Sequence, residues 1–175
     1  WLNYEQYKAI EVEAIRNISS TMAVMVVIIA FLLVNPKAVA VVCFCLCLII
    51  IDIIGYMHFW DLTLDSVTII MLIIALGLSV DYAAHIGRAF MEVHGTPDER
   101  LRMCLENMGV AVFNGAVSTF LAVLILAGSK SYVFITFFRQ LFLCIVFGLA
   151  HGLVLLPVLM SIVNPKPYAK GAFGH

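Results

Sequence analysis

Charged residues are scarce in this sequence, and their scarcity decides the class of protein. Only 12% of the residues are charged and 63% are hydrophobic, whereas soluble domains carry roughly 25% charged and roughly 45–50% apolar residues. One core cannot bury so much apolar surface, so lipid must solvate much of the chain. The formal net charge is -1 and the sequence shows no basic face, which argues against a nucleic-acid partner. The composition predicts a multi-pass integral membrane protein.

The sequence also lacks a disulfide framework and a set of metal ligands. Cys43, Cys45 and Cys47 lie in one apolar run, where the alternate spacing turns Cys45 to the opposite helix face. Cys104 and Cys144 have no second cysteine at the spacing of metal ligands. We therefore expect the cysteines to pack as small hydrophobic residues, with no metal and no cofactor.

Catalytic motifs are absent as well. The sequence contains no G-x-S-x-G, no H-E-x-x-H and no phosphate-binding glycine loop. Asp52 and Asp81 occur on different hydrophobic stretches at different depths, so they do not form a general acid–base pair. The protein is not expected to be an enzyme.

Long hydrophobic stretches are what the sequence does contain. A membrane span needs ~20 mainly apolar residues, and five segments fit: Ile18–Val34, Ala38–Met57, Leu64–Ile86, Val110–Ala127 and Tyr132–Val163. The last is long enough to tilt or to begin in the outer headgroup region. Asn35-Pro36-Lys37 forms a tight turn, because proline cannot continue the first helix. His58-Phe59-Trp60-Asp61 places aromatic residues at an interface. The predicted fold is an all-α, polytopic membrane helical bundle.

A short amphipathic helix is predicted over residues 97–108, between the third and fourth spans. Thr96 is its N-cap, Pro97 lies in the first turn and Glu99 closes a capping box. Four apolar residues then recur at helical spacing on one face: Leu101, Cys104, Leu105 and Met108. The charged residues lie mostly off that face: Arg100, Arg102 and Glu106. The helix should therefore lie along the membrane surface.

Lysine and arginine predict the orientation, because they favour the cytoplasmic side. With the turn at Asn35 inside, six are cytoplasmic: Lys37, Arg88, Arg100, Arg102, Lys166 and Lys170. Three fall on the other side: Lys8, Arg16 and Lys130. The chain then divides into an extracellular or luminal lead-in (1–17), the transmembrane bundle (18–163) and a cytoplasmic C-terminal tail (164–175).

Gly77, Asp81 and His85 follow at i, i+4 and i+8, so they form one stripe along the third span. A charged residue at this depth costs roughly 2.5–3.5 kcal/mol. Gly77 leaves room for a neighbouring backbone, a water molecule or an ion to approach the carboxylate. The stripe is a candidate cation or proton site. The alternative is that Asp81 only hydrogen-bonds a neighbouring helix.

Other small and polar residues of the spans favour structural roles. Gly148 and Gly152 form a G-x-x-x-G step that allows close helix contact. His151 lies between them, and Pro157 is expected to bend the helix. Ser118 and Thr119 could bond back to their own backbone or reach a neighbouring carboxylate, and the sequence leaves both open.

Depth arithmetic predicts a structural ion pair between Asp52 and Arg139. Asp52 lies roughly 21 Å from the start of its span, which leaves it about 9 Å below the outer boundary of a core of about 30 Å. Arg139 lies roughly 10 Å below the same boundary. The alternative is that each charge snorkels separately to the outer interface.

Four stretches resemble one family of membrane proteins. They are "GLSVDYAAHIGRAF", "NGAVSTFLAVLILAGS", "FFRQLFLCIVFGLAHGLVLLPVLMS" and "YEQY". The first looks like a glycine-x-x-x-acid motif followed by a histidine. In the chain "YEQY" comes first, and the other three stretches follow in the order given. Together the four stretches are similar to Patched, Dispatched and Niemann–Pick C type transporters of the resistance-nodulation-division superfamily.

The resemblance implies that the five spans are helices eight to twelve of a twelve-helix transporter, which is half of its transmembrane domain. It implies that Asp81, with Gly77 and His85, couples transport to a proton or sodium gradient, and that the substrates are sterols or other membrane lipids. The chain begins with Trp1 and looks like a segment of a longer or processed protein. Its partners would be the missing N-terminal half or other membrane subunits. The alternative is a half-repeat reused as a structural, non-transporting subunit of a larger complex.

Overall fold

The structure, a computed structural model, describes residues 2–60, 62–63 and 65–168, and this part of the chain is helical with no strand. Its long helices are α1 (Leu2–Leu33), α2 (Pro36–Phe59), α3 (Ser66–Glu92), α5 (Val110–Leu124) and α6 (Tyr132–Leu149). Five helical stretches are long and apolar enough to cross a membrane: Val12–Leu33, Pro36–Phe59, Ser66–Glu92, Pro97–Gly128 and Tyr132–Val163. The predicted all-α membrane bundle of five spans is confirmed.

The fourth and fifth stretches change helix type along their length. The fourth joins α4 (Pro97–Cys104), the π-helical segment η1 (Leu105–Gly109), α5 and the 3-10 segment η2 (Ile125–Gly128). The predicted amphipathic helix therefore runs on into α5 and is not a separate element. The fifth joins α6, the π-helical segment η3 (Ala150–Leu155) and α7 (Leu156–Val163). Pro157 is the second residue of α7. Because it has no N–H, it cannot bond to the carbonyl one turn back, which lies in η3.

Side-chain caps fix where three of the helices begin. The Asn35 side chain accepts the N–H groups of Lys37 and Ala38 and so starts α2 at the predicted turn. Asp65 and Thr68 form a capping box at the start of α3. Thr96 and Glu99 form the predicted capping box of α4. Each cap satisfies N–H groups that have no partner inside the helix.

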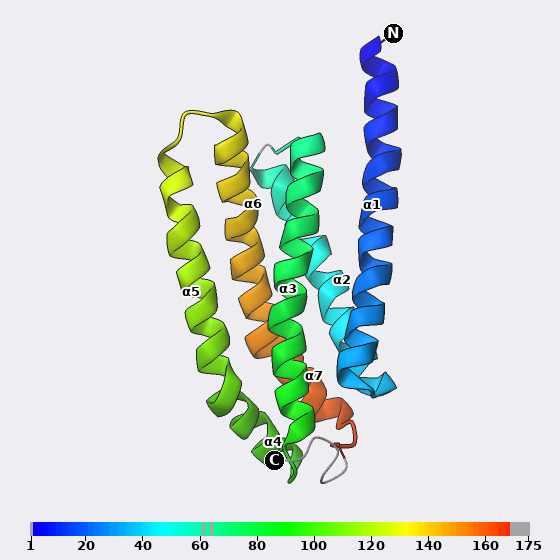
Figure 1. Cartoon of the computed structure of the whole chain (residues 1–175), viewed down its shortest axis with the longest axis vertical. Coiled ribbons are helices and arrows are strands. Elements are labelled where there is room, and N and C mark those ends of the chain that lie inside the picture. The colour runs from blue at the N-terminus through cyan, green and yellow to red at the C-terminus, as the bar shows by residue number, and fades with distance from the viewer. Residues whose placement is uncertain (1, 61, 64, 169–175) are drawn as a thin grey trace.

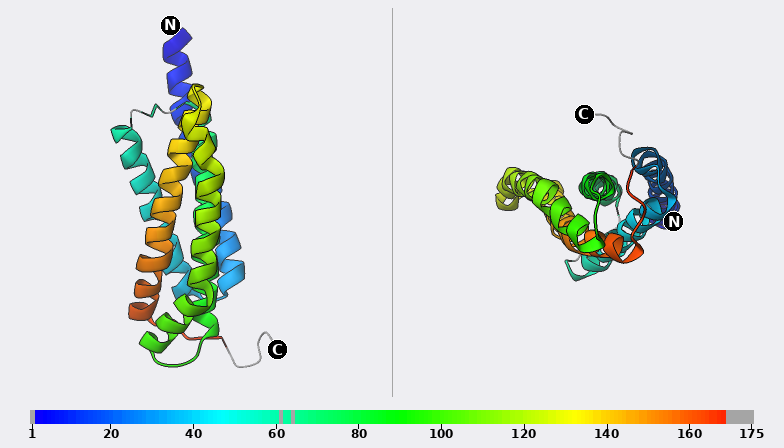
Figure 2. Two further views of the ribbon diagram at one scale, coloured as in Figure 1. Left: turned by 90° about the vertical axis from the view of Figure 1, so that its left-hand side faces the viewer. Right: turned by 90° about the horizontal axis from the view of Figure 1, so that it is seen from below.

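The third span, α3, is the most enclosed of the five. In its most apolar window 61% of the residues are buried, against 6% for the span within α1. Seen along the helices, α5, α6, α2 and α1 follow a curved row, and α3 stands on its concave side (Figure 2). One face of α3 therefore packs into the row and the opposite face is open. The N-terminal end of α1 extends beyond the rest of the bundle (Figure 1).

A buried arginine holds together the end of the bundle where α4 lies, the lower end in Figure 1. The guanidinium of Arg100 donates to Asn164 Oδ1 at 2.8 Å, to the carbonyl of Pro165 at 2.9 Å and to the carbonyl of Phe90 at 3.0 Å. Its central carbon lies 4.3 Å from the centre of the Phe90 ring. Arg100 is therefore bound to the ends of α3 and α7 at once.

The expectation that Arg100 lies off the buried face of the amphipathic helix is wrong, since the residue is only 1% exposed. The spacing of apolar residues does not reveal a charged side chain that is buried. Carbonyl groups at helix ends lack helical partners and carry partial negative charge, so they satisfy the guanidinium away from water. Arg102, in contrast, is exposed as expected and pairs with Glu106 at 2.7 Å.

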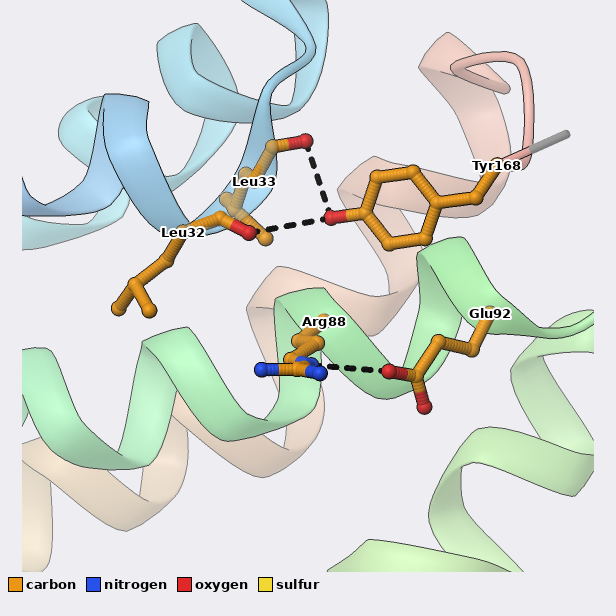
Figure 3. Close-up of polar contacts among 5 residues, drawn as sticks. All are labelled: Leu32, Leu33, Arg88, Glu92 and Tyr168. Atoms are coloured by element: carbon orange, nitrogen blue, oxygen red, sulfur yellow. Dashed lines mark hydrogen bonds and ion pairs between the residues drawn. The ribbon is translucent and has the colours of Figure 1, made fainter. Parts of the chain in front are cut away.

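After α7 the chain turns back across the same end of the bundle. The Tyr168 hydroxyl donates to the carbonyls of Leu32 and Leu33 at the end of α1, at 3.3 and 3.0 Å (Figure 3). Its backbone N–H donates to the carbonyl of Met91 at 3.0 Å. Arg88 and Glu92 pair next to this contact at 2.8 Å (Figure 3). Residues 164–168 of the predicted tail thus pack on α1 and α3, and residues 169–175 lie outside the described residues.

Candidate functional site

The predicted stripe lies on the open face of α3. The side chains of Asp81 and His85 are exposed and Gly77 is half-buried. The residues that follow them in the chain, Tyr82 and Ile86, are buried in the bundle. The helical spacing therefore brings Asp81 and His85 to the side of α3 that faces away from the curved row, and Gly77 lies next to Met25 of α1.

Within the part of the chain that the structure describes, Asp81 and His85 make no hydrogen bond or ion pair. The buried hydroxyls of Thr68 and Ser79 on α3, in contrast, donate to the backbone carbonyls of Thr63 and Ala75. A carboxylate in a membrane span is costly unless it is paired, hydrated or protonated. The alternative role for Asp81 was a hydrogen bond to a neighbouring helix. Among the described residues, none of the four other spans provides a hydrogen-bond partner for its carboxylate.

Gly77 leaves space one turn away from the Asp81 carboxylate. A Cβ atom added at Gly77 would have one close neighbour, the terminal methyl carbon of Met25 on α1, at 3.9 Å. This is ordinary van der Waals distance, so α1 does not press on the glycine. The open face beside Asp81 is accessible to another helix or to an ion, as the glycine suggests.

The candidate supporting residues on α5 do not contact Asp81. The Thr119 hydroxyl donates to the carbonyl of Gly115 at 2.9 Å, which is the backbone bond that its helical position predicts. Ser118 is exposed. The hydroxyl of Tyr82, the residue after Asp81, is buried without a hydrogen-bond partner among the described residues. No hydrogen bond of the described residues therefore links Thr119 to the carboxylate.

Gly148 and Gly152 lie against α3, where Tyr82 fills the space that they leave. A Cβ atom added at Gly148 would lie 3.2 Å from Tyr82 Cδ2, and one added at Gly152 would lie 3.5 Å from Tyr82 Cβ. The two glycines thus bring α6 and η3 close to α3 at the level of Asp81. The sequence patterns did not single out Tyr82; its position directly after an intramembrane aspartate was the available signal.

The predicted ion pair between Asp52 and Arg139 is not formed. Asp52 Oδ2 lies 3.4 Å from Nε2 of His151. Arg139 donates instead to the carbonyl of Trp60 at 3.0 Å, near the end of α2. The two predicted partners bind different residues at different levels of the same α2–α6 contact.

The depth arithmetic failed because α6 begins beyond the end of α2. Tyr132, the first residue of α6, lies level with the connection that follows α2, since its hydroxyl contacts Thr63 Oγ1 at 3.2 Å and Asp65 Oδ2 at 2.9 Å. Arg139 is then level with Trp60, and the residue level with Asp52 is His151. Arg139 and His151 are twelve positions apart in the chain, which corresponds to about 18 Å of helix.

Comparisons with known proteins find long relatives and no family model that matches the chain. Protein patched homolog 3 of Caenorhabditis elegans is 33% identical over 165 residues, 94% of this chain and 12% of that protein. NPC intracellular cholesterol transporter 1 homolog 1b of Drosophila melanogaster is 33% identical over 168 residues, with 94% and 13% covered. Protein patched homolog 1 of Danio rerio is 33% identical over 166 residues, with 94% and 14% covered. The chain thus spans only 12–14% of the length of these curated relatives.

Proposed function

We propose, since this chain belongs to the Patched and Niemann–Pick C family of membrane proteins, that it forms the C-terminal transmembrane half of a lipid or sterol transporter or receptor. In this proposal Asp81 takes up and releases a proton or a sodium ion, and its occupancy is coupled to movement of the substrate. His85 and Gly77 complete the site on the open face of α3. One relative is named as a cholesterol transporter homologue, which supports a sterol or related lipid as the substrate.

The observation that carries the proposal is the unpartnered carboxylate of Asp81. It lies in a membrane span, it is exposed on the open face of α3, and it bonds to no described residue. A permanent charge in that position would be expensive, whereas a carboxylate that binds a cation or a proton can be neutralised. The curved arrangement of the bundle leaves this face available to further helices (Figure 2).

Those helices would come from another half of the same protein or from other membrane subunits. Alternating access needs two repeats that move against each other, and the five spans described here provide one. The relatives are several-fold longer than this chain, which supports the first source. The intact mass of the native protein separates the two: a chain several-fold heavier than 19.3 kDa supports a transporter half, and a stable 19.3 kDa subunit supports the structural role.

Asp81→Asn tests the coupling role in the full-length protein. Asparagine keeps the shape and hydrogen-bonding capacity of the side chain and removes its charge and its titration. Sterol transport by the protein in liposomes should lose its dependence on an imposed proton or sodium gradient, while expression and thermal stability persist. Asp98→Asn, at the exposed start of α4, is the matched control and should keep that dependence. Gradient-dependent transport by Asp81→Asn at the rate of the wild-type protein would refute the proposal.

A further inference from the structure

We infer that Asp52 of α2 and His151 of η3 form a second proton-binding site in the membrane, independent of the role proposed for Asp81. His151 Nε2 lies 3.4 Å from Asp52 Oδ2, and its other ring nitrogen, Nδ1, lies 3.0 Å from the carbonyl oxygen of Phe147. The side chain of His151 is 14% exposed and that of Asp52 is 38% exposed. Both residues lie within membrane spans.

The two contacts of the imidazole determine how many protons the pair holds. A carbonyl oxygen only accepts hydrogen bonds, so Nδ1 must carry a hydrogen and donate it to Phe147. The second nitrogen, Nε2, then faces the Asp52 carboxylate. If neither group carried a further proton, two lone pairs would face each other at 3.4 Å. One proton between them makes the contact favourable, either as imidazolium and carboxylate or as imidazole and carboxylic acid.

The charge of the pair depends on that proton. With the proton bound, the pair is neutral overall in either form. Without it, the pair has a net charge of −1 in a membrane span, where uncompensated charge is strongly disfavoured. Asp52 forms no ion pair with a lysine or arginine among the described residues, and Arg139 donates to the Trp60 carbonyl instead. The proton is therefore what neutralises Asp52.

The other titratable groups that the structure describes around the pair do not neutralise Asp52. The ring of Tyr56, one turn along α2, packs on the ring of Phe147, with 5.0 Å between the ring centres. Cys144, two turns back on α6, donates to the Ala75 carbonyl on the α3 side. On α3, Tyr82 packs against Gly148 and Gly152, and Asp81 is exposed on the open face.

The position of the pair makes it both reachable and able to affect the bundle. A groove of about 430 Å³, lined by Ala150, His151, Val154, Leu155 and Val158, opens next to the imidazole. His151 belongs to the π-helical segment η3, and such segments occur frequently at functional sites. Gly148 and Gly152, which lie on either side of His151 in the sequence, pack against Tyr82 of α3. The pair thus lies on the α2 side of the same helix that contacts α3 near Asp81.

The test compares the pH dependence of thermal unfolding for variants of the full-length protein in lipid nanodiscs. Between about pH 5.5 and about pH 8.5, the range in which histidine-linked sites titrate, the wild-type midpoint should fall as the pair loses its proton. In Asp52→Asn the amide donates to neutral His151 without a further proton, so at least half of that fall should disappear. Asp98→Asn, at the exposed start of α4 and outside both proposed sites, is the matched control and should keep the wild-type pH dependence.

Non-additivity shows that the two residues titrate as one site. His151→Gln should remove the same part of the pH dependence, and the double variant Asp52→Asn/His151→Gln should remove no more than either single variant. If a single variant does not fold, Asp52→Leu/His151→Phe carries the comparison, because an apolar replacement of both partners of a buried pair is often tolerated. Full pH dependence in Asp52→Asn or in the apolar double variant, or simple addition of the two single effects, would overturn the inference.

Discussion

A Cβ atom placed on Gly148 would lie 3.2 Å from Cδ2 of Tyr82, the closest such approach among the described helical glycines. The contact joins α6 to α3, and Tyr82 follows Asp81 directly in the chain. Any side chain at position 148 would therefore push on the helix that carries the candidate coupling carboxylate. The glycine is needed for packing, and its effect can be separated from the intrinsic helix preference of glycine.

We expect Gly148→Ala to destabilise the protein by about 1–2 kcal/mol, because an extra methyl group in a packed contact forces neighbouring atoms to shift. Gly115→Ala is the matched control. A Cβ atom at Gly115 on α5 would meet nothing within 4 Å, so alanine should stabilise that helix by up to about 1 kcal/mol. Thermal unfolding of both variants in nanodiscs measures the difference. Equal stability of the two variants would show that Tyr82 gives way without cost.

The Arg100 hydrogen bonds should be worth more than any exposed ion pair of α4. Arg100→Gln removes a guanidinium that bonds two backbone carbonyls and the Asn164 side chain. Leaving these acceptors unpaired should cost about 2–3 kcal/mol. Arg102→Gln removes only the exposed pair with Glu106 and should leave the unfolding midpoint nearly unchanged. Comparable losses in both variants would contradict the buried position of Arg100.

Cysteine labelling tests the same burial and the orientation of the bundle. A membrane-impermeant maleimide should label Arg102→Cys rapidly and Arg100→Cys slowly, because Arg100 is only 1% exposed. The lysine and arginine count predicts that this end of the bundle lies in the cytoplasm, so labelling of Arg102→Cys should require access from the cytoplasmic side. Labelling of intact cells from outside would reverse the orientation.

Hydropathy and capping patterns were sufficient to predict the helices, but side-chain partners were not predictable from them. The five spans follow from length and apolarity alone, and the Thr96–Glu99 capping box follows from local hydrogen bonds. Burial of Arg100 and the partner of Asp52 depend on how helices rotate and slide against one another. In a membrane the lipid-facing side is as apolar as the packed side, so periodicity does not report which face is buried.

The wrong prediction of a pair between Asp52 and Arg139 has the same cause, because it depended on how far α6 slides along α2. Counting from Tyr132 assumed that α6 begins at the membrane boundary, whereas the Tyr132 hydroxyl contacts Asp65, which lies after the end of α2. The stripe of Gly77, Asp81 and His85 was easier to predict, because all three residues lie on one helix and need only its 3.6-residue period. What such a stripe faces still depends on the neighbouring helices, and for α3 that face is open.

Val34 adopts a backbone conformation that suits its side chain poorly. Its φ angle is +48°, in the left-handed region, which is a genuine outlier for a β-branched residue. Asn164 adopts a similar conformation at the end of α7, with φ +44°, and asparagine tolerates it. We expect Val34→Asn to stabilise the protein by about 0.5–1 kcal/mol through relief of this strain. Val27→Asn, at an exposed helical position on α1, should give no such gain, and a loss of stability in Val34→Asn would show that the strain is small.

Gly77→Leu tests whether the space beside Asp81 serves the fold or the coupling site. A Cβ atom at Gly77 would touch only the Met25 methyl carbon, at 3.9 Å, and leucine is a good helix former, so the variant should fold and unfold at or near the wild-type midpoint. The larger side chain would nevertheless cover the approach to the carboxylate one turn away. We therefore expect gradient-dependent transport by the full-length protein to fall by roughly tenfold or more, the effect of about 1.4 kcal/mol on a rate-limiting barrier. Gly55→Leu is the control, because a Cβ atom there meets nothing within 4 Å and Gly55 lies on α2, away from the stripe. A stable Gly77→Leu variant that transports as fast as Gly55→Leu would mean that the open space beside Asp81 has no part in coupling.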